Sequence, residues 1–324
     1  MSDKRYILTI ATGKKTYTNM AANLARSFLW WHQNSDIQFQ LVTDQPASVP
    51  ADIKDKIQII EVEPGQLGKG FSAKLQLDNL VCEGKTLFID SDCLVFGPLN
   101  GVFDKFNNLP VSVVGDYMST GEWFGDVTSI CKKFNVPRLP KFNGGIYYLE
   151  KGEISAQVYT TARQLEKQYD EIGFIRLRGQ PNDEVLMALA MQLHNQVPVP
   201  DDGTIMSDPQ ACRGNYTIDV IKGNRLLINP PPPSQLHQNW YPFEKVAPLI
   251  VHFLGHYALH YPYRREAYRL DKALNHQSTW LSNLKSIAFI EYPERLNLFL
   301  KNTFRAAFHK IFGVRKIKSS DRTV

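Results

Sequence analysis

Short apolar runs and helix-spaced apolar residues alternate along the first third of the chain. Apolar runs rich in β-branched and aromatic residues predict strands at residues 6–11, 37–42, 57–62 and 86–89. Apolar residues at helical spacing predict one helix from Asn19 to Trp31 and another over Ser72–Val81. This order of elements predicts an α/β protein with a mostly parallel central sheet and crossover helices.

The rest of the chain continues this pattern less regularly. Strands are predicted at residues 111–114, 144–149, 226–228 and 249–253, and helices at 154–169 and from Pro181 to about His194. Proline and the acids Asp183 and Glu184 mark the start of the second helix, since both favour a first helical turn. The four prolines at 230–233 must be extended, and the pattern from Tyr257 onward is mostly helical.

The strand predicted at residues 86–89 stops at two carboxylates, Asp90 and Asp92, with Ser91 between them. Ligands of open α/β sheets bind at the carboxyl ends of the strands. Side chains two residues apart on an extended segment point the same way, so both carboxylates can face one ion. Oxygen ligands of this kind suit Mg²⁺ or Mn²⁺ bridging to phosphates.

A second candidate segment ends the strand predicted at residues 249–253. His252 arrives there at a loop that contains Gly255 and His256. A neutral imidazole can complete an Asp-Asp site for Mn²⁺, and the glycine lets backbone approach a phosphate. The alternative is a hydrogen-bonded core histidine.

Charge and cysteine content narrow the function classes. The 324-residue chain has a formal net charge of +5, but its sequence has no helix-turn-helix, zinc-finger or RNA-binding pattern, so we expect no nucleic-acid partner. The four cysteines lack Cys-x-x-Cys spacing, which argues against a structural zinc site, and Cys82 and Cys93 are interpreted as core residues. No signal-peptide pattern or spanning apolar run is predicted, so the cytoplasm is the expected compartment.

Five motifs in order resemble the retaining family 8 glycosyltransferases, which include glycogenin and bacterial lipopolysaccharide galactosyl- and glucosyltransferases. The motifs are Phe71–Leu75, Leu87–Asp92, Phe142–Ile146, Asn182–Glu184 and Val251–Gly255. The resemblance implies the GT-A fold, an α/β fold with a mostly parallel sheet flanked by helices. We therefore expect a catalytic domain over residues 1–262 and a helical, basic tail over residues 263–324.

The resemblance also implies an activity and its residues. The expected reaction moves a hexose from a nucleotide sugar, most simply a UDP-sugar, to a glycan, lipid-linked or protein acceptor with retention of configuration. The resemblance implies Mn²⁺ or Mg²⁺ on Asp90, Asp92 and His252, and catalytic roles for Lys74, Asp183 and Glu184. The implied donor-binding residues are Ala11, Thr12, Tyr17, Lys74, Ser91, Asn143, Gly144, Gly145, Gly255 and His256.

The chain departs from the family pattern at two places. The family often carries Lys-Pro-Trp after the last motif, where this chain has Ala258–His260. One phosphate contact is therefore either missing or supplied by His256, Lys69 or Arg264. Glu184 replaces the usual glutamine. A carboxylate there would act as a nucleophile or stabilise an oxocarbenium-like state, or it is a simple helix-start acid.

Two other functions stay open. An apolar strand followed by Asp-x-Asp is also the first motif of the haloacid-dehalogenase-type phosphatases. In those enzymes the motif lies at the first strand, whereas in this chain three predicted strands precede it. The missing Lys-Pro-Trp would suit a degenerate nucleotide-sugar-binding protein, against which the intact Asp90, Asp92 and His252 argue.

Aromatic and basic residues interleave in the tail. They are Phe299, Phe304, Phe308, Ile311 and Phe312 with Lys301, Arg305, Lys310, Arg315, Lys316 and Lys318. A basic, aromatic amphipathic helix predicts peripheral contact with an anionic membrane, here the inner face, which would suit a lipid-linked acceptor. The alternative is a terminal helix whose apolar face docks on the body of the protein.

Overall fold

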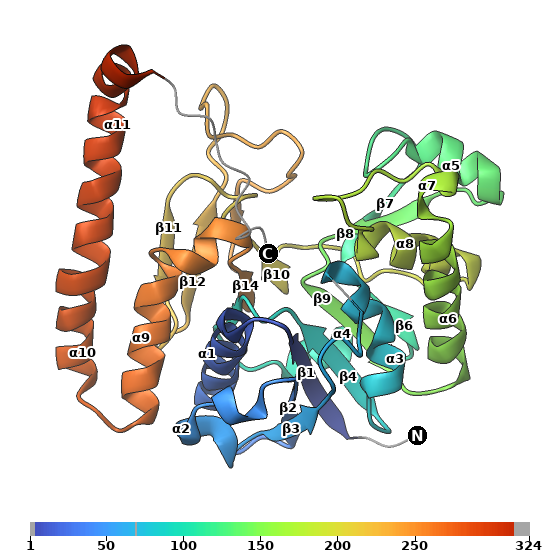
Figure 1. Cartoon of the computed structure of the whole chain (residues 1–324), viewed down its shortest axis with the longest axis horizontal. Coiled ribbons are helices and arrows are strands. Elements are labelled where there is room, and N and C mark those ends of the chain that lie inside the picture. The colour runs from blue at the N-terminus through green and yellow to red at the C-terminus, as the bar shows by residue number, and fades with distance from the viewer. Residues whose placement is uncertain (1–3, 69, 314–324) are drawn as a thin grey trace.

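The computed structural model describes residues 4–68 and 70–313 (Figure 1). Its central sheet has the strand order β3-β2-β1-β4-β9-β6. The strands are β1 (Arg5–Ala11), β2 (Ile37–Thr43), β3 (Gln58–Glu61), β4 (Lys85–Ile89), β6 (Val111–Ser112) and β9 (Ile146–Glu150). The first four are parallel, and β9 is antiparallel to both β4 and β6. The predicted α/β class with a mostly parallel sheet is confirmed.

Alternating side chains divide the apolar core between the two faces of the sheet. On β1 and β4, Ile7 and Leu87 belong to one buried cluster, whereas Leu8 and Phe88 belong to the other. Helices α1 (Lys15–Trp31) and α4 (Asn100–Lys105) cover the first face; α6 (Glu153–Lys167) and α8 (Asp183–Leu193) cover the second. Figure 1 shows α1 and α6 on opposite sides of the strands. The period of two along a strand therefore produces three layers.

Three smaller sheets and several short helices complete the fold. The sheets are β10 (Met206–Ser207), β14 (Ile250–His252) and β5 (Cys93–Val95); β11 (Tyr216–Asp219), β12 (Asn224–Ile228) and β13 (Lys245–Val246); and β7 (Gly115–Met118) with β8 (Leu139–Phe142). The short helices are η1 (Pro46–Ser48), α2 (Ala51–Lys54), α5 (Val127–Phe134), α7 (Tyr169–Ile172) and η3 (Gly255–Leu259).

The helix predicted over Ser72–Val81 is wrong as a continuous α-helix. The segment is a 3₁₀ helix, η2 (Gly70–Gln76), followed by the single turn α3 (Leu77–Leu80). Arg163 on α6 donates to the backbone oxygen of Leu75 at 2.6 Å, a carbonyl that a continuous helix would use internally. A tertiary contact has replaced a helical hydrogen bond.

The chain after η3 is helical, as predicted. It forms α9 (Tyr263–Leu274), α10 (Thr279–Ser286), the π-helical turn η4 (Ile287–Glu291) and α11 (Tyr292–Phe312). Leu270 of α9 packs into a third buried cluster with Met20 of α1 and Phe253, whereas α11 extends along the outside of the molecule (Figure 1). None of the described helices has both the length and the apolar character needed to cross a membrane.

His32, at the end of α1, ties that helix to the start of α4. Its ring stacks on Phe28 with centroids 4.3 Å apart, and its Nδ1 lies 2.9 Å from the backbone oxygen of Phe28. Nε2 lies 2.9 Å from the backbone nitrogen of Leu99 and must accept that hydrogen. Burial lowers the pKa of His32, partly opposed by the hydrogen bond to Phe28. The neutral ring is therefore the form that the fold requires.

We expect the free energy of unfolding to fall as the pH is lowered below about 6.5, the ordinary histidine pKa. The unfolded chain binds a proton on His32 there while the folded protein does not, because the pKa in the folded state is the lower of the two. In denaturant titrations at several pH values from 7.5 to 5.5, the free energy of unfolding of His32→Gln should change less with pH than that of the parent protein. The exposed His309→Gln serves as the control, and equal slopes in the parent and His32→Gln would contradict the prediction.

Candidate functional site

The two motif carboxylates follow β4 in a turn. The backbone nitrogen of Cys93 donates to the backbone oxygen of Asp90 at 3.0 Å, so residues 90–93 form a turn. The prediction of an extended segment between the two carboxylates is therefore wrong. The carboxylates converge nevertheless. Oδ1 of Asp92 lies 3.1 Å from Nε2 of His252, and Oδ2 of Asp90 lies 3.9 Å from the same nitrogen. The turn, and not the alternation of side chains along a strand, directs both carboxylates toward Nε2 of His252.

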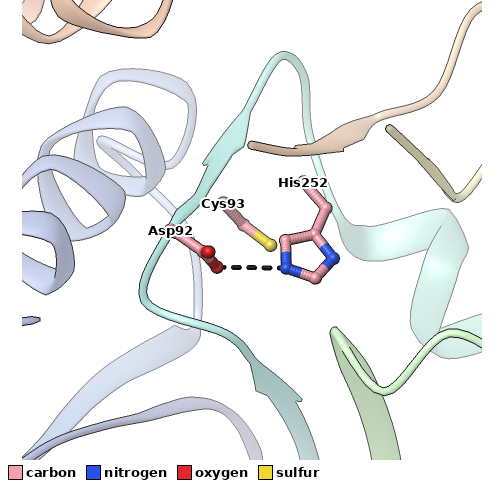
Figure 2. Close-up of side chains that lie close together, drawn as sticks. All are labelled: Asp92, Cys93 and His252. Atoms are coloured by element: carbon pink, nitrogen blue, oxygen red, sulfur yellow. Dashed lines mark ion pairs between the residues drawn. The ribbon is translucent and has the colours of Figure 1, made fainter. Parts of the chain in front are cut away.

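His252 reaches the carboxylates through a strand pair outside the central sheet. β14 runs antiparallel to β5, and His252 lies opposite Cys93 in that register. Figure 2 shows the imidazole facing the Asp92 carboxylate, with the Cys93 sulfur beside it. Burial lowers the pKa of His252, but the charge and hydrogen bond of Asp92 raise it to about 9. The pair is therefore an imidazolium and a carboxylate.

Asn143 orients the imidazole from the opposite side. Its Oδ1 lies 3.0 Å from Nδ1 of His252 and accepts from the backbone nitrogen of Gly145, also at 3.0 Å. Its Nδ2 lies 3.4 Å from Oδ2 of the buried Asp208, a residue that the sequence analysis missed. Because Nδ1 keeps its proton toward Asn143, the proton on Nε2 is the one that a bound cation would displace.

Lys74 joins three parts of the site. Its Nζ lies 2.7 Å from Oδ2 of Asp90, 2.8 Å from the backbone oxygen of Gly144 and 3.7 Å from Oδ2 of Asp183. Burial lowers the pKa of Lys74, but the carboxylates of Asp183 and Asp90 outweigh burial and raise it above the usual value. The ammonium is therefore permanently charged, and its contacts connect the end of β4, the loop at Gly144 and the start of α8.

The first turn of α8 contributes the remaining acids. Asn182 caps the helix by accepting from the backbone nitrogen of Glu184 at 2.7 Å. Asp183 accepts a short hydrogen bond from the Tyr147 hydroxyl, and Oε1 of Glu184 accepts from the backbone nitrogen of Gly144 at 2.8 Å. Burial, followed by the charge of Asp183, raises the pKa of Glu184 to about 7. The helix predicted from Pro181 to about His194 is confirmed, although it begins two residues later, at Asp183.

The site holds more acidic than basic groups. Its carboxyl groups are Asp90, Asp92, Asp183, Glu184 and Asp208, and its cations are Lys74 and His252. Burial raises the pKa of both Asp90 and Asp208, which shows that their charge is incompletely balanced. Oxygen ligands with excess negative charge are what Mg²⁺ or Mn²⁺ requires. These residues therefore fit a divalent cation.

The loop after β1 borders the acidic group. The Thr43 hydroxyl donates to the backbone oxygen of Ala11 at 2.7 Å, and the Asp44 carboxylate accepts from the backbone nitrogen of Gly13, which follows Thr12. Tyr17, near the start of α1, is close enough to the site for Asp92 to raise its pKa, after the larger effect of burial, and for Arg178 to lower it. Asp44 holds the loop that follows β1, and Arg178, which no sequence motif indicated, lies near Tyr17.

The remaining residues predicted to bind the donor are Ser91, Gly255 and His256. Ser91 is buried within the turn, and Gly255 adopts a positive φ of 62°. His256 is exposed and packs on Tyr257, with ring centroids 4.2 Å apart. Of the other two candidates for the phosphate contact, Arg264 pairs with Glu294 at 2.6 Å, and Lys69 lies outside the described residues.

Comparison with known proteins decides the fold. No protein-family model and no curated protein matches the sequence. The structure of the galactosyltransferase LgtC with donor and acceptor sugar analogues matches with a TM-score of 0.53 and 15% identity, over 84% of this chain and 96% of that one. The chain has the GT-A fold. That fold does not favour the phosphatase alternative.

Two further solved structures match more weakly. One is an active-site mutant of LgtC, with a TM-score of 0.47 and 15% identity over 76% of this chain and 86% of that one. The other is mouse xyloside xylosyltransferase 1, with a TM-score of 0.44 and 13% identity over 63% of this chain and 87% of that one. The candidate metal ligands Asp90, Asp92 and His252 and the acids of α8 belong to one contact network, whereas His256 packs on Tyr257.

The glycine loop can be tested by adding one methyl group. A Cβ on Gly145 would lie 2.6 Å from Nδ1 of His252 and 2.9 Å from the sulfur of Met206. We expect Gly145→Ala to lower the free energy of unfolding by about 1–3 kcal/mol and to weaken Mn²⁺ binding, because the imidazole must move. Denaturant titration and Mn²⁺ electron paramagnetic resonance would measure the two effects.

The matched control is Gly101→Ala on α4, where an added Cβ meets nothing within 4 Å. It should leave Mn²⁺ binding unchanged and leave stability unchanged or slightly higher. Unaltered Mn²⁺ affinity in Gly145→Ala would contradict the placement of His252 in the metal site.

Proposed function

We propose that this protein is a metal-dependent glycosyltransferase that moves a hexose from a nucleotide sugar, a UDP-sugar, to a glycan, lipid-linked or protein acceptor. The observation that carries the proposal is the convergence of Asp90, Asp92 and His252 beside the loop after β1. The structure of LgtC, which shares the fold, contains donor and acceptor sugar analogues. Residues 1–262 form the catalytic domain in this proposal.

Asp90, Asp92 and His252 would hold Mn²⁺ or Mg²⁺. The bound ion would supply positive charge to a diphosphate leaving group, on which negative charge builds as the glycosidic bond breaks. Asn143 keeps the His252 ring in the orientation that presents Nε2. Lys74 donates to Oδ2 of Asp90, the oxygen that lies 3.9 Å from Nε2 of His252, and so limits where that carboxylate can point.

The nucleotide would lie across the loop after β1. Ala11, Thr12 and Tyr17 are the proposed contacts to uracil and ribose. Arg178 lies near Tyr17, as its effect on the pKa of Tyr17 indicates. We assign to this exposed guanidinium the diphosphate contact that the absent Lys-Pro-Trp lysine would otherwise make. His256 and the backbone at Gly255 would supply contacts on the other side.

Asp183 and Glu184 would act on the transferred sugar. The Tyr147 hydroxyl donates to Oδ2 of the buried Asp183, and Oδ1 is the oxygen that would accept from a sugar hydroxyl. Glu184 is fixed by the Gly144 backbone nitrogen, and the absence of a Cβ at Gly144 lets Asp183 and Glu184 pack closely against the loop. A carboxylate held this way can stabilise an oxocarbenium-like state or attack it, and either course suits transfer with retention.

The deciding experiment combines binding and turnover. We expect UDP with Mn²⁺ to raise the thermal midpoint, because a ligand of the folded state stabilises it, and one UDP-sugar to be hydrolysed in a metal-dependent way. Asp92→Asn and His252→Ala should each lose about 100-fold or more of that turnover, as expected when charge stabilisation of a leaving group is removed. Asp36→Asn, an exposed carboxylate paired with Arg5, is the control.

The outcomes separate the alternatives. Nucleotide binding without turnover against any acceptor extract would favour the degenerate binding protein. Phosphate release from a monoester would favour the phosphatase. Full metal-dependent activity in Asp92→Asn would contradict the metal assignment.

We also propose that residues 263–324 place the enzyme at the inner face of a membrane, near a lipid-linked acceptor. Helix α11 and the preceding turn η4 leave large apolar side chains in solvent: Phe289 in η4 (78% exposed), and Phe299 (63%), Phe304 (59%) and Ile311 (72%) in α11. Lys301, Arg305 and Lys310 are exposed on the same helix; Arg315, Lys316 and Lys318 lie outside the described residues. Apolar and basic groups together match an anionic lipid surface better than a docked core helix.

The membrane contact predicts a lipid-dependent flotation. The full chain should float with vesicles that contain phosphatidylglycerol and stay in the soluble fraction with phosphatidylcholine vesicles, because lysine and arginine need anionic headgroups. Replacing both Phe299 and Phe304 with glutamate should abolish flotation and leave the Mn²⁺-dependent UDP shift unchanged. Absence of flotation in the unaltered chain would rule out this role.

A further inference from the structure

We propose that Asp92, Cys93 and His252 bind a thiophilic cation of the Zn²⁺ class, in a site that overlaps the proposed Mn²⁺ or Mg²⁺ site. One ligand atom from each side chain, a carboxylate oxygen, a sulfur and an imidazole nitrogen, lies within 4.8 Å of the other two. All three residues are buried. Figure 2 shows the Cys93 sulfur directed toward the imidazole of His252.

The backbone fixes this grouping. Cys93 and His252 are directly opposite in the antiparallel pair β5–β14, so their side chains leave the same face of that small sheet. Asp92 enters from the turn that precedes β5, and its Oδ1 lies 3.1 Å from Nε2 of His252. Two strands and one turn therefore supply the three ligands, and the register of β5 against β14 sets their separation.

The ligand types determine which cation is preferred. Carboxylate oxygens suit Mg²⁺ and Mn²⁺, whereas a thiolate with an imidazole selects Zn²⁺ and chemically similar ions. Three protein ligands leave a fourth position of a tetrahedral Zn²⁺ site for water or for Asp90, whose Oδ2 lies 3.9 Å from Nε2 of His252. This site differs from a four-cysteine structural site, which the cysteine spacing excludes.

Binding is a simple exchange of protons for a metal ion. The Cys93 S–H bond and the Nε2–H bond of His252 break, both protons go to solvent, and bonds from sulfur and nitrogen to the cation form. No electrons are transferred, so no oxidant or reductant is needed. Because Asp92 and His252 are shared, a thiophilic cation and Mn²⁺ should displace each other. The inference rests on the proposed function only in sharing these two ligands, and not on sugar transfer.

Co²⁺ provides a direct probe, since it takes Zn²⁺ geometry and reports bound thiolate through a charge-transfer band in the near ultraviolet. Titrating the full chain with Co²⁺ alone, without nucleotide, should produce this band and saturate at one equivalent. Cys93→Ser should lose the band, and Cys131→Ser, which removes another buried cysteine on α5, should keep it.

Affinities measured by calorimetry complete the test. Zn²⁺ affinity should fall at least about tenfold in Cys93→Ser, because loss of even an indirect partner of a metal ligand lowers metal affinity by about 10-fold to 100-fold. Mn²⁺ affinity should stay within about twofold, since Mn²⁺ would not use the sulfur. Cys93→Ala serves if the serine variant does not fold, as judged by circular dichroism. Absence of the band in the parent protein, or its persistence in the Cys93 variants, would overturn the inference. A band in a protein that turns over no nucleotide sugar would refute only the proposed function.

Discussion

The buried contact between Asp92 and His252 is the interaction on which the candidate site depends. Its two partners are 160 residues apart in sequence and meet at 3.1 Å because β5 and β14 pair in one register. A shift of that register by one residue would turn His252 to the other face and remove it from the carboxylates. The small β10-β14-β5 sheet is thus as important to the chemistry as the larger central sheet.

The second constraint on the site is that the backbone at Gly144 and Gly145 must lie very close to charged side chains. Lys74 contacts a carboxylate and a backbone oxygen at hydrogen-bond distance, and the carbonyl that it uses belongs to Gly144. An added Cβ at Gly144 would meet Asp183 at 3.0 Å, and one at Gly145 would displace His252. The glycine pair is therefore a steric requirement of packing five carboxyl groups, one lysine and one histidine in one place. The same crowding brings Cys93 into the reach of a cation.

Sequence patterns located most of the fold and part of the site. The apolar runs that became β1 and β4 were recognisable because buried parallel strands are nearly continuous in apolar residues. Asp90 and Asp92 were recognisable because they end such a run. The 3₁₀ geometry of η2 and the turn at Asp90 were not, since both depend on hydrogen bonds to distant residues, such as that from Arg163 to Leu75. Asp208 and Arg178 were missed because each lies in an irregular segment.

The sequence by itself determined the order of strands and helices and the chemical groups that the protein can offer, because hydrophobic period and local helix-start signals act over a few residues. It also placed Asn182, Asp183 and Glu184 at a helix start. Only the tertiary structure decided that β9 runs antiparallel to β4 and so brings Asn143 to the edge where Asp90 lies. It also decided which nitrogen of His252 faces Asp92 and that Cys93 lies beside both. These are long-range pairings, and their geometry is fixed by packing that no local pattern encodes.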